Sequence, residues 1–264
     1  MSGNDDGAFS DAEAAHYNDA GYVVRESVFD GAELAEVTAA CEALVERLTR
    51  GRRGRRRRFG SYTFDLDLEN GTVIKWEGDS AVVHGLEPFV HLSARLERHA
   101  ADHRFLAPMR SILQCDAPAL FTEKLNLKRP REGGANPFHQ DYPYWVGVAA
   151  NAAEVATAML FLDDASESNG CLHVVPGSHK RGEWPRPESA DPFAGNEFDA
   201  SLFDGADVTA LEVPAGSVVF FGPMLVHMSA PNTSEHERRA LLYSYQPPGR
   251  PTQLDVLWRT YGSG

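Results

Sequence analysis

Two residues of the short motif His139-Gln140-Asp141 could hold a metal ion. In an extended segment, side chains two positions apart lie on one face, so His139 and Asp141 can reach the same point while Gln140 points away. One imidazole and one carboxylate are two of the three ligands in the facial triad that binds non-haem Fe(II). The motif therefore predicts an iron site that needs one more ligand.

The candidate for that ligand is His227, which follows the apolar run 218–221 and a Gly-Pro turn. A jelly roll brings distant strands face to face, so the separation of 86 positions from Asp141 to His227 is compatible with one site. Taken alone, His227 would be interpreted as an ordinary core or turn histidine. Together with the first motif, it is predicted to complete the triad.

Two adjacent arginines, Arg238 and Arg239, lie in the strand-like segment 238–246. Alternation places them on opposite faces of a strand, so only one of them can point into a barrel. A buried guanidinium needs an anion, and its planar fork fits a carboxylate. Taken alone, Arg238 would be interpreted as half of a surface ion pair.

Three aromatic residues, Tyr142, Tyr144 and Trp145, directly follow the metal motif. Small-molecule pockets are commonly lined by aromatic side chains, and the position beside the metal favours that role over a place in the core. We therefore expect these three residues to contact a substrate.

The elements that must position these residues can also be predicted. Ser10 and Glu13 have capping-box spacing for a helix from about Asp11 to Asp19, and a short strand follows at 22–24. Apolar residues that recur three or four positions apart predict an amphipathic helix over 31–48. Further predictions are a hairpin that turns at Asn70-Gly71 and a helix from about Pro88 to Ala101.

From about Leu120 onward, short strand-like runs alternate with turn signals, which is typical of an antiparallel jelly roll. The predicted fold class is mainly β with flanking helices. We expect a single domain over 1–264, with a helical N-terminal part over 1–115 and a jelly-roll core over 116–250. The segment 184–207 is expected to be an insertion over one face.

Composition restricts the possible partners of the chain. Its 264 residues include 38 acidic and 25 basic side chains, and the net charge of −13 argues against a nucleic-acid surface. The run over 50–58 contains seven arginines and is expected to be a mobile loop. An alternative role for this run is an anion clamp for a phosphate, a CoA group or a carrier protein.

The compartment is predicted from what the sequence lacks. Its three cysteines are scattered and odd in number, so they indicate neither a disulfide framework nor a zinc knuckle. The first twenty residues do not have the pattern of a signal peptide, and no run of eighteen apolar residues occurs. We therefore expect a cytoplasmic protein with no membrane partner.

Four motifs together resemble the phytanoyl-CoA dioxygenase (PhyH) family of Fe(II)- and 2-oxoglutarate-dependent oxygenases. They are HQD at 139–141, NGCLHVVPGSHK at 169–180, FFGPMLVH ending at His227, and the N-x-S…R-R-A pattern over 232–240. HxD alone is a weak signal, whereas four motifs in the order and spacing of the family are specific. The resemblance implies a double-stranded β-helix, which is a cupin-like jelly roll.

The resemblance also implies site residues. The implied iron ligands, which are also the catalytic residues, are His139, Asp141 and His227. Arg238 would bind the distal carboxylate of 2-oxoglutarate, assisted by Ser229, which lies two positions beyond the distal histidine. Asn126 matches a further position that contacts the cosubstrate in the family.

The implied activity uses Fe(II), 2-oxoglutarate and O2 to hydroxylate an unactivated C–H bond of a small molecule, with release of succinate and CO2. A secondary metabolite or a carrier- or CoA-linked acid would be such a substrate. Relatives that chlorinate lack the carboxylate ligand, so Asp141 favours hydroxylation over chlorination. Desaturation and ring closure remain alternatives.

Two other functions can be considered. One is a catalytically inactive jelly-roll protein that binds small molecules, against which the complete ligand set and Arg238 argue. The other is a nucleic-acid-associated protein that uses the arginine run, which the net acidity and the lack of aromatic residues within the run disfavour.

Overall fold

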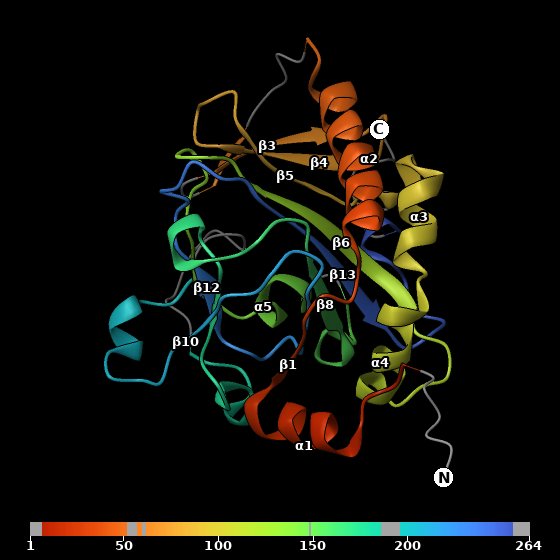
Figure 1. The fold of residues 1–264 in the computed structure, drawn as a ribbon, viewed down its shortest axis with the longest axis vertical. Helices are drawn as coiled ribbons and strands as arrows, with labels where there is room; N and C mark the ends of the chain where they lie inside the picture. Colours follow the sequence, from red (N-terminus) through yellow and green to blue (C-terminus); the bar gives the residue numbers. More distant parts are fainter. Residues whose placement is uncertain (1–6, 52–56, 60–61, 148, 186–195, 256–264) are drawn as a thin grey trace.

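The computed structural model describes residues 7–51, 57–59, 62–147, 149–185 and 196–255, which form two antiparallel sheets with helices on the outside (Figure 1). In the larger sheet the strand order is β1-β11-β8-β13-β6-β5-β4-β3-β2. Its strands are β1 Tyr22–Arg25, β2 Arg57–Phe59, β3 Tyr62–Asp67, β4 Thr72–Glu77, β5 Val83–Glu87, β6 Ala119–Lys128, β8 Ala156–Phe161, β11 Val218–Phe221 and β13 Arg238–Gln246. The smaller sheet has the order β10-β9-β12-β7, with β7 Asn136–His139, β9 Leu172–Val174, β10 Thr209–Leu211 and β12 His227–Ser229. This arrangement confirms the predicted fold class.

The helices begin and end where the sequence supplies caps. The α-helices are α1 Asp11–Ala20, α2 Gly31–Thr49, α3 Ala94–Ala100, α4 His103–Leu113 and α5 Tyr142–Trp145. The Ser10 side chain and Glu13 form the predicted capping box of α1, and Gly21 ends that helix with a φ of 90°. Asp30 caps α2 by accepting hydrogen bonds from two backbone N–H groups of its first turn. Figure 1 shows α2 and α3 side by side near β3, β4 and β5.

The larger sheet is buried on both faces in the strands next to the site. In β11, Phe220 faces the cluster that α2, α3 and α4 complete, whereas Phe221 faces the cluster shared with the smaller sheet. The same alternation in β13 places Leu241 toward the helices and Ala240 toward the smaller sheet. Burial on both faces explains why these strands are continuous apolar runs in the sequence.

Three sequence predictions need correction or qualification. Arg57 and Arg58 lie in β2, which pairs with β3, so this end of the arginine run is a strand rather than a loop. Strands pair through their backbones and do not require apolar side chains. The sequence analysis missed this strand because the arginine run lacks the apolar alternation from which strands are predicted. Residues 52–56 lie outside the described residues. The hairpin of β3 and β4 around the Asn70-Gly71 turn is confirmed.

The predicted helix over 88–101 is shorter and interrupted. A single 3₁₀ turn spans Val90–Leu92, and Ser93 is extended and caps α3 with its side chain. The sequence analysis did not predict α4, which contains Pro108. The N-terminal part is also less helical than expected, because β1 to β5 belong to the same sheet as β6.

The described end of the segment predicted as an insertion packs beside the smaller sheet. Residues 186–195 within it lie outside the described residues. Beyond them, Phe198 and Phe203 pack with Val175 and Val226 in a small buried cluster. No helix among the described residues is long and apolar enough to cross a membrane.

Candidate metal centre

His139, Asp141 and His227 converge on one point between two neighbouring strands of the smaller sheet. His139 ends β7 and His227 begins β12, and the two are direct partners in the antiparallel register. One potential ligand atom from each of the three residues lies within 4.8 Å of the other two. The register of one strand pair thus brings together His139 and His227, which are 88 positions apart in the sequence.

Both histidines are held in the same way. The Nδ1 atom of His139 lies 2.7 Å from the carbonyl of Pro137, and that of His227 lies 3.0 Å from the carbonyl of Leu225. An Nδ1–H that donates to a carbonyl fixes the ring and leaves Nε2 with a lone pair for a metal. Burial, followed by repulsion from His227, lowers the pKa of His139 to about 3, so its imidazole is neutral.

The Asp141 carboxylate is buried and ionised. Burial opposes ionisation, but the positive charge of Lys124 holds the pKa of Asp141 below its ordinary value. The Lys124 ammonium lies 3.8 Å from an oxygen of Asp141. The three ligands therefore offer two imidazole nitrogens and one carboxylate oxygen, which suits Fe(II) and leaves further coordination positions open.

Gln140 points away from the two ligands that flank it, as predicted. Its side-chain amide donates to the carbonyls of Gly182 and Met224, at 2.9 and 2.6 Å, and its carbonyl accepts from the backbone of Trp184. Met224 lies in the loop that precedes β12. Gln140 therefore ties the strand of the first two ligands to the segment that leads to His227.

Arg238 and Arg239 point in opposite directions, which confirms the predicted strand register. Arg239 is bound on the outside by Asp163 at 2.6 Å and by Glu42 at 3.2 Å. Arg238 is only 1% exposed, donates from Nε to the carbonyl of Gly170, and has an Nη1 with no hydrogen-bond partner among the described residues. Burial lowers its pKa to about 10, so it stays charged at neutral pH and needs an anion.

Ser229 and Asn126 lie on strands that contribute to the same region. Ser229 follows His227 by two positions in β12, and its hydroxyl accepts a hydrogen bond from the Asn136 side chain at 3.2 Å. Asn126 is the partner of Ala240 in the register of β6 and β13. It is partly exposed while Leu125 and Leu127 are buried, as the predicted alternation requires.

A buried lysine that the sequence analysis missed lies opposite Arg238. Lys128 is the direct partner of Arg238 across β6 and β13, and it donates to the carbonyls of Ala230 and Gly134. Burial, followed by repulsion from Arg238, lowers the pKa of Lys128 to about 7. Positive charge is thus concentrated at the start of β13, at Arg238. This is where the resemblance places an acidic cosubstrate.

The three aromatic residues after the metal motif have different surroundings. Tyr144 is 37% exposed, and its ring centre lies 5.8 Å from that of His139. Trp145 is buried against Phe121, and Tyr142 is partly buried beside the same cluster. Tyr144 is therefore at the metal centre itself, whereas Trp145 has a core position.

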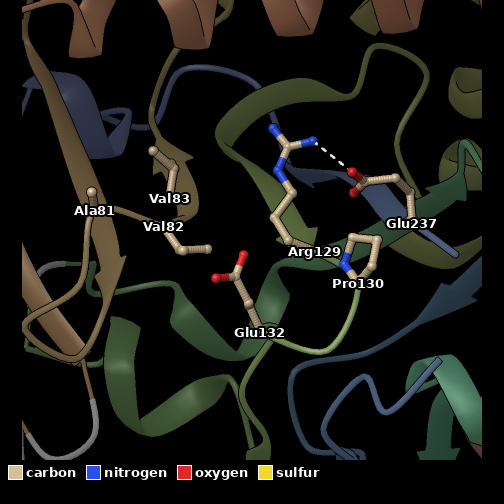
Figure 2. Close-up of a pocket in the computed structure, with 7 residues that line it drawn as sticks. All are labelled: Ala81, Val82, Val83, Arg129, Pro130, Glu132 and Glu237. Carbon is tan, nitrogen blue, oxygen red and sulfur yellow. Dashed lines mark hydrogen bonds and ion pairs between the residues drawn. The ribbon is translucent and has the colours of Figure 1, made fainter. Parts of the chain in front are cut away.

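A surface pocket elsewhere in the molecule takes no part in this centre. Figure 2 shows it between Val82 and Val83 on one side and Arg129 and Glu132 on the other. Its arginine is already paired, with Glu237 at 3.2 Å. None of the predicted site residues lines this pocket.

Comparisons with known proteins agree with this geometry. Residues 17–240 match the phytanoyl-CoA dioxygenase (PhyH) family. An L-proline trans-4-hydroxylase of Streptomyces griseoviridis is 32% identical over 192 residues, which cover 66% of this chain and 70% of that protein. An ectoine dioxygenase of Bordetella parapertussis is 27% identical over 262 residues, which cover 91% of this chain and 77% of that protein.

Two solved structures have a similar fold. EctD from S. alaskensis, solved with 2-oxoglutarate and 5-hydroxyectoine, superposes with a TM-score of 0.72 at 22% identity, covering 94% of this chain and 79% of that one. The epimerase SnoN from nogalamycin biosynthesis, solved with Fe³⁺ and α-ketoglutarate, gives a TM-score of 0.67 at 23% identity, covering 96% and 90%.

The residues present fit both an iron ion and an acidic cosubstrate, since three convergent ligand atoms lie in a chain that also buries a guanidinium with an unpartnered Nη1. The chain belongs to the phytanoyl-CoA dioxygenase family and is an Fe(II)- and 2-oxoglutarate-dependent dioxygenase.

Proposed function

We propose that this dioxygenase hydroxylates a C–H bond of a small molecule at a centre formed by His139, Asp141 and His227. The observation that carries the proposal is the convergence of these three ligand atoms within 4.8 Å of one another. When bound there, iron and 2-oxoglutarate activate dioxygen, and oxidation of the cosubstrate to succinate and CO2 accompanies oxidation of the substrate. The residues of the chain position the reactants for that chemistry.

The protein's part is to keep the ligands in the right state. The backbone carbonyls that bind Nδ1 keep both imidazoles oriented with Nε2 toward the metal, and Lys124 keeps Asp141 ionised. Because Asp141 supplies the third ligand, no halide is needed at its position, which favours hydroxylation over chlorination.

Arg238 is proposed to bind the distal carboxylate of 2-oxoglutarate. The Nη1 of its buried guanidinium meets no hydrogen-bond partner from the residues that the structure describes, and a carboxylate would satisfy both the charge and the hydrogen bond. Ser229 and Asn126 are proposed to assist it from β12 and β6. Arg239 is occupied by Asp163 and Glu42 and is assigned no part in binding.

The proposed substrate is a small molecule, as for the relatives whose names specify L-proline and ectoine. Tyr144, exposed and in ring contact with His139, is proposed to contact it. Tyr142 and Trp145 are proposed to pack behind Tyr144 and so to form part of the wall of the substrate site. We also propose a reducing, cytoplasmic location, since the three cysteines form no disulfide.

The test is a screen of small molecules for stimulated 2-oxoglutarate turnover, followed by reaction of each hit under ¹⁸O2. We expect succinate and a product heavier by one ¹⁸O atom in a ratio near one, and loss of both in His227→Ala. A hit whose product contains no ¹⁸O would contradict hydroxylation. Binding of the same molecules without any succinate would instead support a jelly-roll protein that binds but does not turn over.

A further inference from the structure

A row of alternating charges crosses the larger sheet and ends at the metal centre. Lys75 in β4 donates to Glu87 in β5 at 2.5 Å, and Lys124 in β6 lies 3.8 Å from the other oxygen of Glu87. The same Lys124 ammonium lies 3.8 Å from Asp141. The row therefore consists of two ammonium groups and two carboxylates, and one of these carboxylates is a proposed iron ligand.

The Lys124 ammonium has unused donor capacity. Both of its carboxylate contacts are long, at 3.8 Å, so its ammonium is held mainly by charge. The side chains of Lys124 and Lys75 remain 17% and 21% exposed, so neither is sealed in the core. The centre of the Trp145 ring lies 5.5 Å from the ammonium. An ammonium has three N–H donors, and Glu87 and Asp141 approach that of Lys124 only at 3.8 Å.

Charge balance changes when the centre is loaded. Iron(II), the 2-oxoglutarate dianion, the Asp141 carboxylate and the Arg238 guanidinium together sum to zero. Asp141 is then committed to the metal, and Glu87 alone remains for two ammonium groups. An excess positive charge in a largely buried setting calls for an anion.

We propose that Lys124, supported by Lys75, binds an anionic group of the substrate, either a carboxylate or a phosphonate. This inference rests on the proposed function, because it places the substrate beside a centre loaded with iron and 2-oxoglutarate. Glu87 holds the two lysines apart and competes with the substrate anion for them. The site thereby selects small acids over neutral molecules of the same shape.

The experiment measures anion binding to the holoenzyme without turnover. The protein is loaded anaerobically with Fe(II) and 2-oxoglutarate and titrated calorimetrically at low ionic strength with acetate, methylphosphonate and, as the neutral counterpart of acetate, acetamide. We expect saturable binding of at least one anion and none of acetamide. The stronger of the two anions identifies the preferred head group.

Two variants with opposite expected effects carry the test. Lys124→Met removes a charge-assisted contact and should weaken anion binding by about 10-fold or more. Glu87→Gln removes the competing carboxylate and should tighten binding. Lys180→Met is the matched control, because Lys180 is an exposed lysine paired with Asp19, and it should change nothing.

Several results would overturn the inference. They are acetamide binding as well as acetate, no saturable anion binding in the wild type, or equal binding in wild type and Lys124→Met. Binding of the anion directly to iron would survive Lys124→Met and is separated in this way. If Lys124→Met fails to fold, anion binding by Glu87→Gln decides the question: tighter binding than in the wild type supports the inference, and unchanged or weaker binding overturns it. Failure of the proposed function would show earlier and differently, as a wild type that does not form the iron and 2-oxoglutarate complex.

Discussion

Replacing Arg238 with alanine should strongly weaken 2-oxoglutarate binding, while the same change at Arg239 should be mild. Arg238 is 1% exposed, and its Nη1 has no partner in the described part of the chain, whereas Arg239 already has Asp163 and Glu42 as partners. Because the two residues are neighbours in β13, they form a matched pair that differs only in the face of the sheet.

The magnitude follows from the contact that is lost. A hydrogen bond to a charged group contributes about 1.5–3 kcal/mol, and a forked guanidinium can make two. Part of that is offset by relief of the buried charge, so we expect a net loss of about 2–4 kcal/mol, or roughly 30- to 1000-fold in affinity. Arg239→Ala should instead lower the free energy of unfolding, since Asp163 loses its arginine partner and Glu42 keeps only Arg129.

The assay is an anaerobic titration of the Fe(II)-loaded protein with 2-oxoglutarate, followed through the weak visible charge-transfer band of the chelate. Thermal unfolding of each variant controls for a loss of folded protein. Equal weakening in both variants, or the reverse ranking, would refute the assignment of Arg238 to the cosubstrate.

Three further predictions concern Glu123, Gln140 and Asp141. Burial raises the pKa of Glu123 from 4.5 to about 7, so the folded state binds the extra proton between these values and stability falls as the pH rises through them. Glu123→Gln should therefore raise the free energy of unfolding by up to roughly 3 kcal/mol at pH 8 and leave it unchanged near pH 4. Urea titrations at the two pH values measure this, and equal effects at both would contradict the prediction. Gln140→Ala loses three hydrogen bonds, so in the same assay the free energy of unfolding should fall by about 2–4 kcal/mol, and iron binding should weaken. Unchanged stability would contradict the role of Gln140 in connecting the two ligand segments. Wild type should give no chlorinated product in high chloride by mass spectrometry, and Asp141→Gly should bind iron more weakly and lose most hydroxylation; a chlorinated wild-type product would show that Asp141 leaves the metal during turnover.

The parts of the site that follow a period of two could be predicted from the sequence. His139 and Asp141 on one side with Gln140 on the other, and Arg238 inward with Arg239 outward, all follow from alternation in extended chain. The capping box of α1 and the Asn70-Gly71 hairpin are equally local signals. Each depends only on residues a few positions apart.

Features that depend on pairing between distant strands could not be predicted. The row of Lys75, Glu87 and Lys124 exists only because β4, β5 and β6 are neighbours, and no local pattern reports that order. The position of Trp145 was also hidden, because the chain turns into the short helix α5 after Asp141. That turn directs Trp145 toward Phe121 and leaves Tyr144 beside His139.

The most direct test of the central claim is metal binding under anaerobic conditions. Fe(II) and 2-oxoglutarate are added to the wild type and to His139→Ala, Asp141→Ala and His227→Ala, and bound iron and the visible band are measured for each. We predict one iron per chain with the band in the wild type, and loss of the band with much weaker iron binding in each variant. Full iron affinity and an unchanged band in any of the three would contradict the assignment of that residue as a ligand.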